Sequence, residues 1–298
     1  MSTAQIGKGQ SLLRVAIAYL VAFGAGAAWL YLGPGTDHLW LDGLIADLVA
    51  TAVVFIASRL HGNSSFYDAY WSVLPPLLVV YWWSEGGLDT GDLRPWLVLG
   101  VIVFWAVRLT GNWIYAFPGL HHEDWRYPML REKAGKAEAL VDLMGIHVFP
   151  TLQVFLALVP AYVAVTWVGR DVGWLDWVAV LVGVASVVLS FAADLQMYRF
   201  ARVRQPGQAM DSGLWSWSRH PNYFGEFGFW LSLALFGIAT APGDWWWLVL
   251  GAVGIVAMFQ GASIPMMEQR SLERRPEYQA VIDRVGRFVP RPPKRARA

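Results

Sequence analysis

The sequence predicts an all-α polytopic membrane protein: a bundle of about eight membrane-spanning helices followed by an amphipathic cytoplasmic C-terminal tail. Of its 298 residues, 56% are hydrophobic and only 15% are charged, whereas soluble domains carry about 25% charged residues. The 18 tryptophans and 11 tyrosines suit the aromatic belts at membrane interfaces. No strand-type alternation of apolar and polar residues stands out.

Eight apolar segments approach the length of about 20 residues that a membrane-crossing helix needs. The third is the weakest, because it is short and contains Pro75 and Pro76. The first follows Lys8 and Arg14 but is longer than the core of a signal peptide, so we interpret it as a retained span. The predicted spans are 12–32, 39–58, 67–84, 95–117, 147–168, 174–196, 222–240 and 245–266.

The lysines and arginines support the number of spans. Eight spans place 20 of the 23 basic residues on one side of the membrane, with Arg94 and Arg170 on the other and Arg108 within a span. Because basic residues collect in cytoplasmic loops, we expect both termini to be cytoplasmic. The opposite loops are short, so we expect the chemistry at the cytoplasmic side.

The segment from Ser218 to Glu226 concentrates polar chemistry at the mouth of an apolar run. Pro221 suits the first turn of a helix, where its missing N–H costs nothing. Arg219 and His220 then precede the helix, while Asn222 and Glu226, four residues apart, share one of its faces. This set suits a cofactor with phosphates and a polar heterocycle. The alternative is a helix cap at the interface with a snorkelling arginine.

Charged residues at membrane depth are costly and usually mark a site. Arg108 lies in the fourth predicted span, and Asp194 lies near the cytoplasmic end of the sixth. Asp68 opens the third span, beside Tyr67. The alternative is internal ion pairing, in which Arg108 contacts Asp68 or Asp194.

The loops and the tail leave several interpretations open. His121 and His122 are adjacent, and the i, i+4 histidine spacing of helical zinc sites is absent, so no metal site is predicted. Residues 131–142 are charged enough for an amphipathic helix on the membrane. The tail after Glu268 has a helical apolar spacing; it either lies on an anionic leaflet or forms a lid that brings Tyr278 and arginines to a nucleotide. Without cysteines, neither disulfides nor thiolate sites form.

Several motifs resemble a known family. Ser-Arg-His-Pro-Asn-Tyr-Phe-Gly-Glu at 218–226, with Gly-Leu-Trp at 213–215, resembles the C-terminal half of membrane steroid 5-alpha-reductases, and above all their uncharacterised bacterial relatives. Glu-Asp-Trp-Arg-Tyr at 123–127 and Arg-Phe-Val-Pro at 287–290 are also typical of those relatives. The resemblance covers about residues 60–292 and is specific over 194–226.

The resemblance implies a reductase that uses NADPH to reduce a carbon–carbon double bond conjugated to a ketone in a lipid or steroid-like substrate. Asp194, Arg199 and Arg202 resemble the family's acid-then-arginine run. Asn222 and Glu226 match its Asn-x-x-Gly-Glu motif, and Arg108 resembles an arginine that meets the phosphates. The full set of predicted cofactor-binding residues is Arg108, Arg126, Asp194, Arg199, Arg202, Arg219, His220, Asn222, Tyr223, Glu226 and Tyr278.

The resemblance has one important departure. The steroid enzymes carry a tyrosine that helps to polarise the substrate ketone, and Trp105 stands in its place here; an indole N–H donates a hydrogen bond but is not the same acid. Asp68 is the nearest candidate for the family's catalytic glutamate. Asp68 and Tyr67 are therefore the predicted catalytic residues, and the substrate is left open.

Two other classes of function remain as alternatives. Isoprenylcysteine carboxyl methyltransferases also use an Arg-His-Pro-x-Tyr motif and bind S-adenosylmethionine, and a non-enzymatic lipid-binding protein is the third possibility. The expected partners are a hydrophobic substrate and membrane lipids, with no nucleic acid and an open oligomeric state. The resemblance places the chain in a bacterial inner membrane, with spans at 1–60 preceding a reductase-like membrane domain at 61–298.

Overall fold

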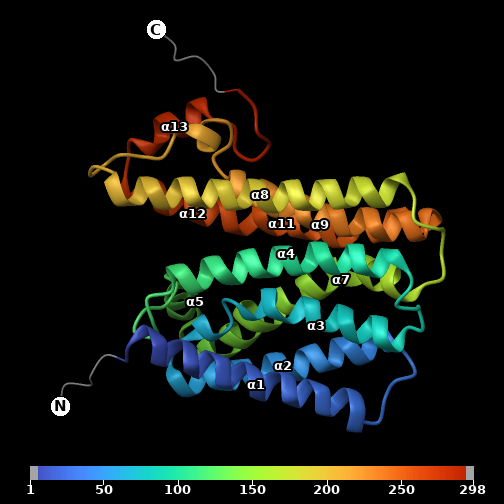
Figure 1. Cartoon of the computed structure of the whole chain (residues 1–298). Helices are drawn as coiled ribbons and strands as arrows, with labels where there is room; N and C mark the ends of the chain where they lie inside the picture. Colours follow the sequence, from blue (N-terminus) through green and yellow to red (C-terminus); the bar gives the residue numbers. More distant parts are fainter. Residues whose placement is uncertain (1–5, 293–298) are drawn as a thin grey trace. The chain divides into compact units, whose positions relative to one another are not determined.

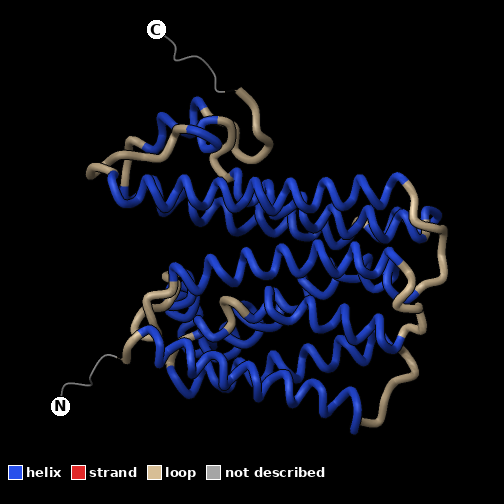
Figure 2. Tube along the Cα trace, in the orientation of Figure 1, coloured by secondary structure: helices blue, strands red, loops and turns tan. Residues whose placement is uncertain are grey.

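The computed structural model describes residues 6–292, and all of the regular structure in that range is helical, which confirms the predicted fold class (Figures 1 and 2). The chain divides into two compact units, residues 1–169 and 170–298. The predicted boundary after residue 60 falls inside the first unit. The long helices of the first unit are α1 (Lys8–Leu32), α2 (Leu39–His61), α3 (Tyr70–Glu85), α4 (Leu93–Ala116) and α7 (Phe149–Thr166).

The basic segments of the first unit meet at one end of its helices. Lys8, in the first turn of α1, donates to the backbone oxygen of Tyr115 in the last turn of α4. Arg59, at the end of α2, pairs with Glu138 and Asp142, which precede α7. These contacts bring the start of α1 and the two basic loops of this unit to one end of its helices. The side of the membrane on which this end lies stays a prediction.

Helix α3 is the shortest of the long helices of the first unit. It has 16 residues with Pro75 and Pro76 inside it, so its length of about 24 Å falls short of the ~30 Å apolar layer of a membrane. Within residues 6–292, seven helices have the length and apolarity to span a membrane, and α3 is not among them. However, α2 and α4 both end near the basic loops, so α3 runs between them from that end of the unit to the opposite end. The membrane crossing that the sequence predicts for this segment stays a prediction.

The predicted amphipathic helix at 131–142 is interrupted. Helix α5 (Arg126–Ala134) stops where Gly135 adopts a φ of 54°, a left-handed conformation that glycine adopts readily. A short helix, α6 (Glu138–Val141), and a π-helical turn (Asp142–Val148) then lead into α7. The segment is held on the protein by ion pairs, described below, and does not form one continuous surface helix.

The second unit consists of three long helical segments and a folded tail. They are α8 (Trp174–Val203), α9 (Pro221–Thr240) and the run of α10 (Trp245–Leu248), α11 (Leu250–Met258) and α12 (Ile264–Arg274), followed by α13 (Tyr278–Arg284). Helix α9 begins at Pro221 with His220 as its N-cap, which confirms the predicted helix start. The tail after Glu268 therefore runs through the end of α12, a short turn and α13.

Candidate functional site

The polar end of the second unit joins α8, α9, α12 and the tail. We call Asp194, Arg219, His220, Asn222 and Glu268 the mouth cluster. The Asn222 side-chain amide donates to Asp194 Oδ1 at 3.1 Å, and its own oxygen accepts from the backbone N–H of Tyr223. The structure thus brings together two predicted cofactor residues that are 28 positions apart.

Glycine allows the close approach of α8 and α9 that forms this pair. A Cβ atom on Gly225 would lie 2.3 Å from Ser190 Oγ and 2.7 Å from the backbone oxygen of Ser186. Ser190 Oγ also donates to the backbone oxygen of Asn222 at 3.0 Å. Gly225 in the Asn-x-x-Gly-Glu motif therefore has a packing role: it lets Asn222 reach Asp194.

Arg219 is buried, with 8% of its surface exposed, and it bonds to the protein on several sides. Its Nε lies 2.7 Å from Glu268 Oε1 on α12. Another of its nitrogens donates to the backbone oxygens of Ile282 and Val285, at 3.0 and 2.7 Å. These bonds fix the tail to the start of α9, a structural task that the sequence analysis did not assign to Arg219.

The tail also forms hydrogen bonds with the segment of chain that precedes α9. The Arg219 N–H donates to Gly286 O, Ser218 Oγ donates to Phe288 O, and the Arg291 N–H donates to Trp217 O. Backbone groups that are bonded in this way give the tail a defined docked position. The structure thus gives the tail a docking surface on the protein itself.

His220 contacts the same carboxylate as Arg219. Its Nε2 lies 3.2 Å from Glu268 Oε1, while its Nδ1 is buried and has no hydrogen-bond partner. Burial lowers the pKa of His220, against the opposing effect of Glu268. In the neutral imidazole, Nε2–H donates a hydrogen bond to the carboxylate, which leaves Nδ1 as a buried hydrogen-bond acceptor.

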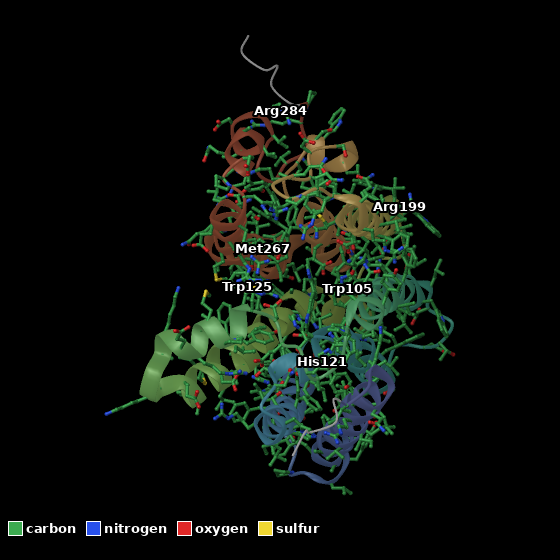
Figure 3. All side chains as sticks on the ribbon, turned by 90° about the vertical axis from the view of Figure 1, so that its left-hand side faces the viewer. Trp105, His121, Trp125, Arg199, Met267 and Arg284 are labelled. Carbon is green, nitrogen blue, oxygen red and sulfur yellow. The ribbon has the colours of Figure 1, made fainter. Side chains whose placement is uncertain are left out.

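Arginines gather around the mouth cluster. Arg199 and Arg202 are exposed on the last turns of α8, and Figure 3 labels Arg199 there, with Met267 on α12 and Arg284 on α13. Burial first, and the neighbouring guanidinium of Arg204 next, lower the pKa of Arg275. Neither Arg204 nor Arg275 was predicted as a site residue; like charges crowded together in this way favour an anion.

The remaining predicted residues of the second unit line the same end. The Tyr223 ring packs at a tilt against Phe259, with ring centroids 4.5 Å apart, and its hydroxyl contacts Met267 Sδ. Glu226 is buried on α9. Burial raises the pKa of Tyr278 to about 12, with the charge of Glu268 adding to the rise, so this hydroxyl stays protonated at neutral pH.

The predicted catalytic residues lie in the first unit, just before α3. Asp68 accepts hydrogen bonds from the Tyr127 hydroxyl at 2.5 Å and from Trp113 Nε1 at 3.4 Å. These two groups hold the carboxylate on the side of α4 and the loop that follows it. Burial raises the pKa of Asp68, and the hydrogen bond from Tyr127 opposes that rise. The Tyr67 hydroxyl lies 2.8 Å from Thr151 Oγ1.

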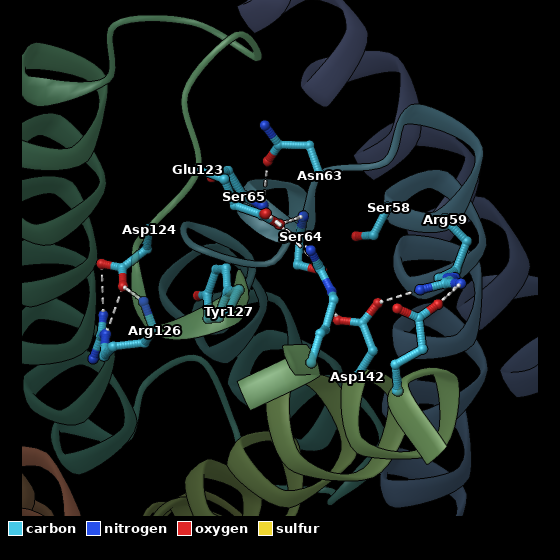
Figure 4. A network of polar contacts seen from close by, with 12 residues as sticks. Ser58, Arg59, Asn63, Ser64, Ser65, Glu123, Asp124, Arg126, Tyr127 and Asp142 are labelled. Atoms are coloured by element: carbon cyan, nitrogen blue, oxygen red, sulfur yellow. Dashed lines mark hydrogen bonds and ion pairs between the residues drawn. The ribbon is translucent and has the colours of Figure 1, made fainter. Parts of the chain in front are cut away.

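An ion-pair network beside these residues ties the connecting segments together (Figure 4). Arg131 contacts both oxygens of Glu123, at 2.8 and 2.9 Å, and also Ser64 Oγ and Asp142 Oδ1. Asp142 has 1% of its surface exposed and accepts from Arg59 and Ser64 as well. The sequence analysis counted Arg131 only as a cytoplasmic charge; the network gives it a structural role.

The other predicted residues of the first unit are Arg108 and Arg126. Arg126 forms an ion pair with Asp124, with Nε 2.8 Å from Oδ1. Trp105, which stands where the family has tyrosine, is 1% exposed and packs edge-on against Trp71. Within residues 6–292, no group of three or more His, Asp or Glu side chains is arranged to hold a metal ion.

The fold and these polar ends define a polytopic helical membrane protein with ionisable side chains gathered at the ends of its helices. The chain belongs to the family described as a protein of unknown function, DUF1295, whose model matches residues 54–285. It is also similar to an uncharacterised protein of Schizosaccharomyces pombe, with 29% identity over 273 residues that cover 84% of this chain and 79% of the relative. No solved structure matches the chain.

Proposed function

We propose that the protein is a membrane-embedded reductase that uses NADPH to reduce a carbon–carbon double bond of a lipid or steroid-like enone. The observation that carries the proposal is the hydrogen-bonded Asp194–Asn222 pair, which lies at the same end of the second unit as the arginines of α8 and the tail. This combination matches the acid, amide and arginine pattern of the 5-alpha-reductase-like motif.

Two features in and around the mouth cluster suit such a cofactor. Arg204 and Arg275 lie near enough for the charge of Arg204 to act on Arg275, and neighbouring guanidinium groups bind phosphate by charge-assisted hydrogen bonds. The buried Nδ1 of His220 is an acceptor without a partner, and buried polar atoms of this kind are normally satisfied. A donor such as a carboxamide or a ribose hydroxyl would complete it.

In this proposal the protein supplies binding and orientation. Arg199, Arg202, Arg204 and Arg275 would hold the phosphates, and Asn222 with Glu226 would orient the nicotinamide amide. The cofactor supplies the hydride when it is bound. Tyr67 and Asp68 remain the predicted proton donors to the substrate. The Tyr67 hydroxyl is buried and lies 2.8 Å from Thr151 Oγ1.

Identification of the bound nucleotide tests the proposal. The protein is purified in a mild detergent, and small molecules that co-elute are identified by mass spectrometry. The proposal expects a nicotinamide nucleotide, and consumption of added NADPH when an enone-bearing lipid is supplied. S-adenosylmethionine or S-adenosylhomocysteine in its place would instead favour the methyltransferase.

A further inference from the structure

A carboxyl group lies buried near the middle of α2 in the first unit. Asp47 has 2% of its surface exposed and lies within a helix that is long and apolar enough to span a membrane. The sequence analysis assigned no role to it, and it lies outside residues 54–285, the part that the family model matches. A buried carboxyl in such a segment needs a specific physical explanation.

Hydroxyl groups surround this carboxyl. Asp47 Oδ1 accepts from the Tyr70 hydroxyl at 2.9 Å and from Thr51 Oγ1 at 3.4 Å. Thr51 Oγ1 lies 3.0 Å from Thr151 Oγ1, which in turn lies 2.8 Å from the Tyr67 hydroxyl. The five side chains come from α2, α7, the first residue of α3 and the segment just before it, and each is at most 3% exposed.

Within residues 6–292, no basic side chain bonds to Asp47, and the ring of His147 packs edge-on against Tyr67 with the centroids 5.1 Å apart. The titratable side chains that act on Asp47 or respond to its charge are Tyr67 and Tyr70, and neither is a cation. Moving an ionised carboxylate out of water is expensive unless an opposite charge pairs with it. Hydrogen bonds from hydroxyl groups offset only part of that cost, so burial favours the neutral acid over the ionised form.

We propose that Asp47 is a proton-binding site at membrane depth, occupied by a proton at neutral pH and linked by hydroxyl groups to Tyr67. Each hydroxyl both donates and accepts a hydrogen bond. When Asp47 is neutral, its O–H is a donor; when the proton leaves, the hydroxyl protons of Tyr70, Thr51, Thr151 and Tyr67 all orient toward the carboxylate. One proton therefore enters or leaves without a change in the heavy-atom positions.

Infrared spectroscopy of the full-length protein in lipid tests this proposal without any assay of reductase activity. Aspartate is labelled with ¹³C at its side-chain carboxyl, and the C=O stretch of protonated carboxylic acids is recorded at pH 7. We expect a component that shifts with the label and with deuteration, and that disappears in Asp47→Asn. The matched control is Asp37→Asn, at an exposed position in the α1–α2 loop whose positive φ suits asparagine, and it should keep the component.

Two further results decide the proposal. Asp47→Asn replaces a neutral acid with a neutral amide of the same shape, so its melting temperature at pH 7 should match that of the wild type. Tyr70→Phe removes a hydrogen bond to the carboxyl, so the component should move to higher frequency. A wild type without the component, or an Asp47→Asn variant that fails to fold or melts well below the wild type, would show that the carboxylate is ionised and would overturn the proposal.

Discussion

Arg219 Nε lies 2.7 Å from Glu268 Oε1, and this buried ion pair joins the start of α9 to α12 across 49 positions of the sequence. The same guanidinium group holds two backbone oxygens of the tail. Glu268 also contacts His220 and lies 3.3 Å from Arg287 Nε. One carboxylate therefore organises the polar end of the second unit.

Arg219→Ala should lower the free energy of unfolding by about 3–5 kcal/mol, because it leaves the buried carboxylate of Glu268 short of its main partner. Arg219→Lys should fall between the alanine variant and the wild type, since an ammonium group keeps the charge but loses the planar fork. Denaturant unfolding in detergent measures both, and limited proteolysis reports release of the tail. Unchanged stability with weakened nucleotide binding would instead give Arg219 the cofactor role that the motif suggests.

Gly225→Ala should destabilise the protein by about 1–3 kcal/mol, the usual cost of overpacking, because the new methyl group would lie against Ser190 and the backbone of Ser186. The matched control is Gly24→Ala on α1, where a Cβ meets nothing within 4 Å. That change should stabilise its helix by about 0.5–1 kcal/mol. If both variants unfold at the wild-type denaturant concentration, α8 and α9 do not pack as closely as described.

The lowered pKa of His220 makes one part of the stability dependent on pH. The folded state binds its proton less readily than the unfolded state, so this contribution is present above the unfolded pKa of about 6.5 and is lost as the pH falls through the folded pKa. His220→Gln should remove that part. Melting curves of both proteins between pH 8 and pH 5 measure the difference; identical pH profiles would contradict the burial of a neutral imidazole.

Cysteine labelling can test whether α3 crosses the membrane, because the chain contains no cysteine of its own. His61→Cys and Thr90→Cys flank α3 at exposed positions, and Lys136→Cys lies in the next basic loop. A membrane-impermeant maleimide should label Thr90→Cys in intact cells or spheroplasts, and the other two only after permeabilisation. Labelling of His61→Cys and Thr90→Cys from the same side would exclude α3 as a crossing.

Much of the helical framework follows from local sequence signals. Pro221 after Arg219 and His220 predicts the start of α9, and the apolar runs beginning at Leu39 and Trp174 predict the starts of α2 and α8. The family resemblance assigns both Asp194 and Asn222 to the cofactor site, and the structure joins them by a hydrogen bond. These features depend on residues close in sequence, or on a motif already known.

The partners of the buried charges were not predictable in the same way. Glu268 is one of several acids in a charged tail, and nothing local marks it as the partner of Arg219. Asp142 and Arg131 likewise look like ordinary loop charges until the fold brings them to Ser64. These arrangements depend on which helices pack together, and apolar periodicity leaves that open.

NADPH binding to the purified protein tests the central claim most directly. The melting temperature of the wild type is recorded with increasing NADPH and with increasing S-adenosylhomocysteine, because a ligand that binds only the folded state raises stability by mass action. Asn222→Ala and the first-unit variant Gly24→Ala serve as the site variant and its control. We expect NADPH to stabilise the wild type and Gly24→Ala, and to stabilise Asn222→Ala much less; stabilisation by S-adenosylhomocysteine with none by NADPH, or an equal NADPH effect on all three proteins, would contradict the proposed cofactor site.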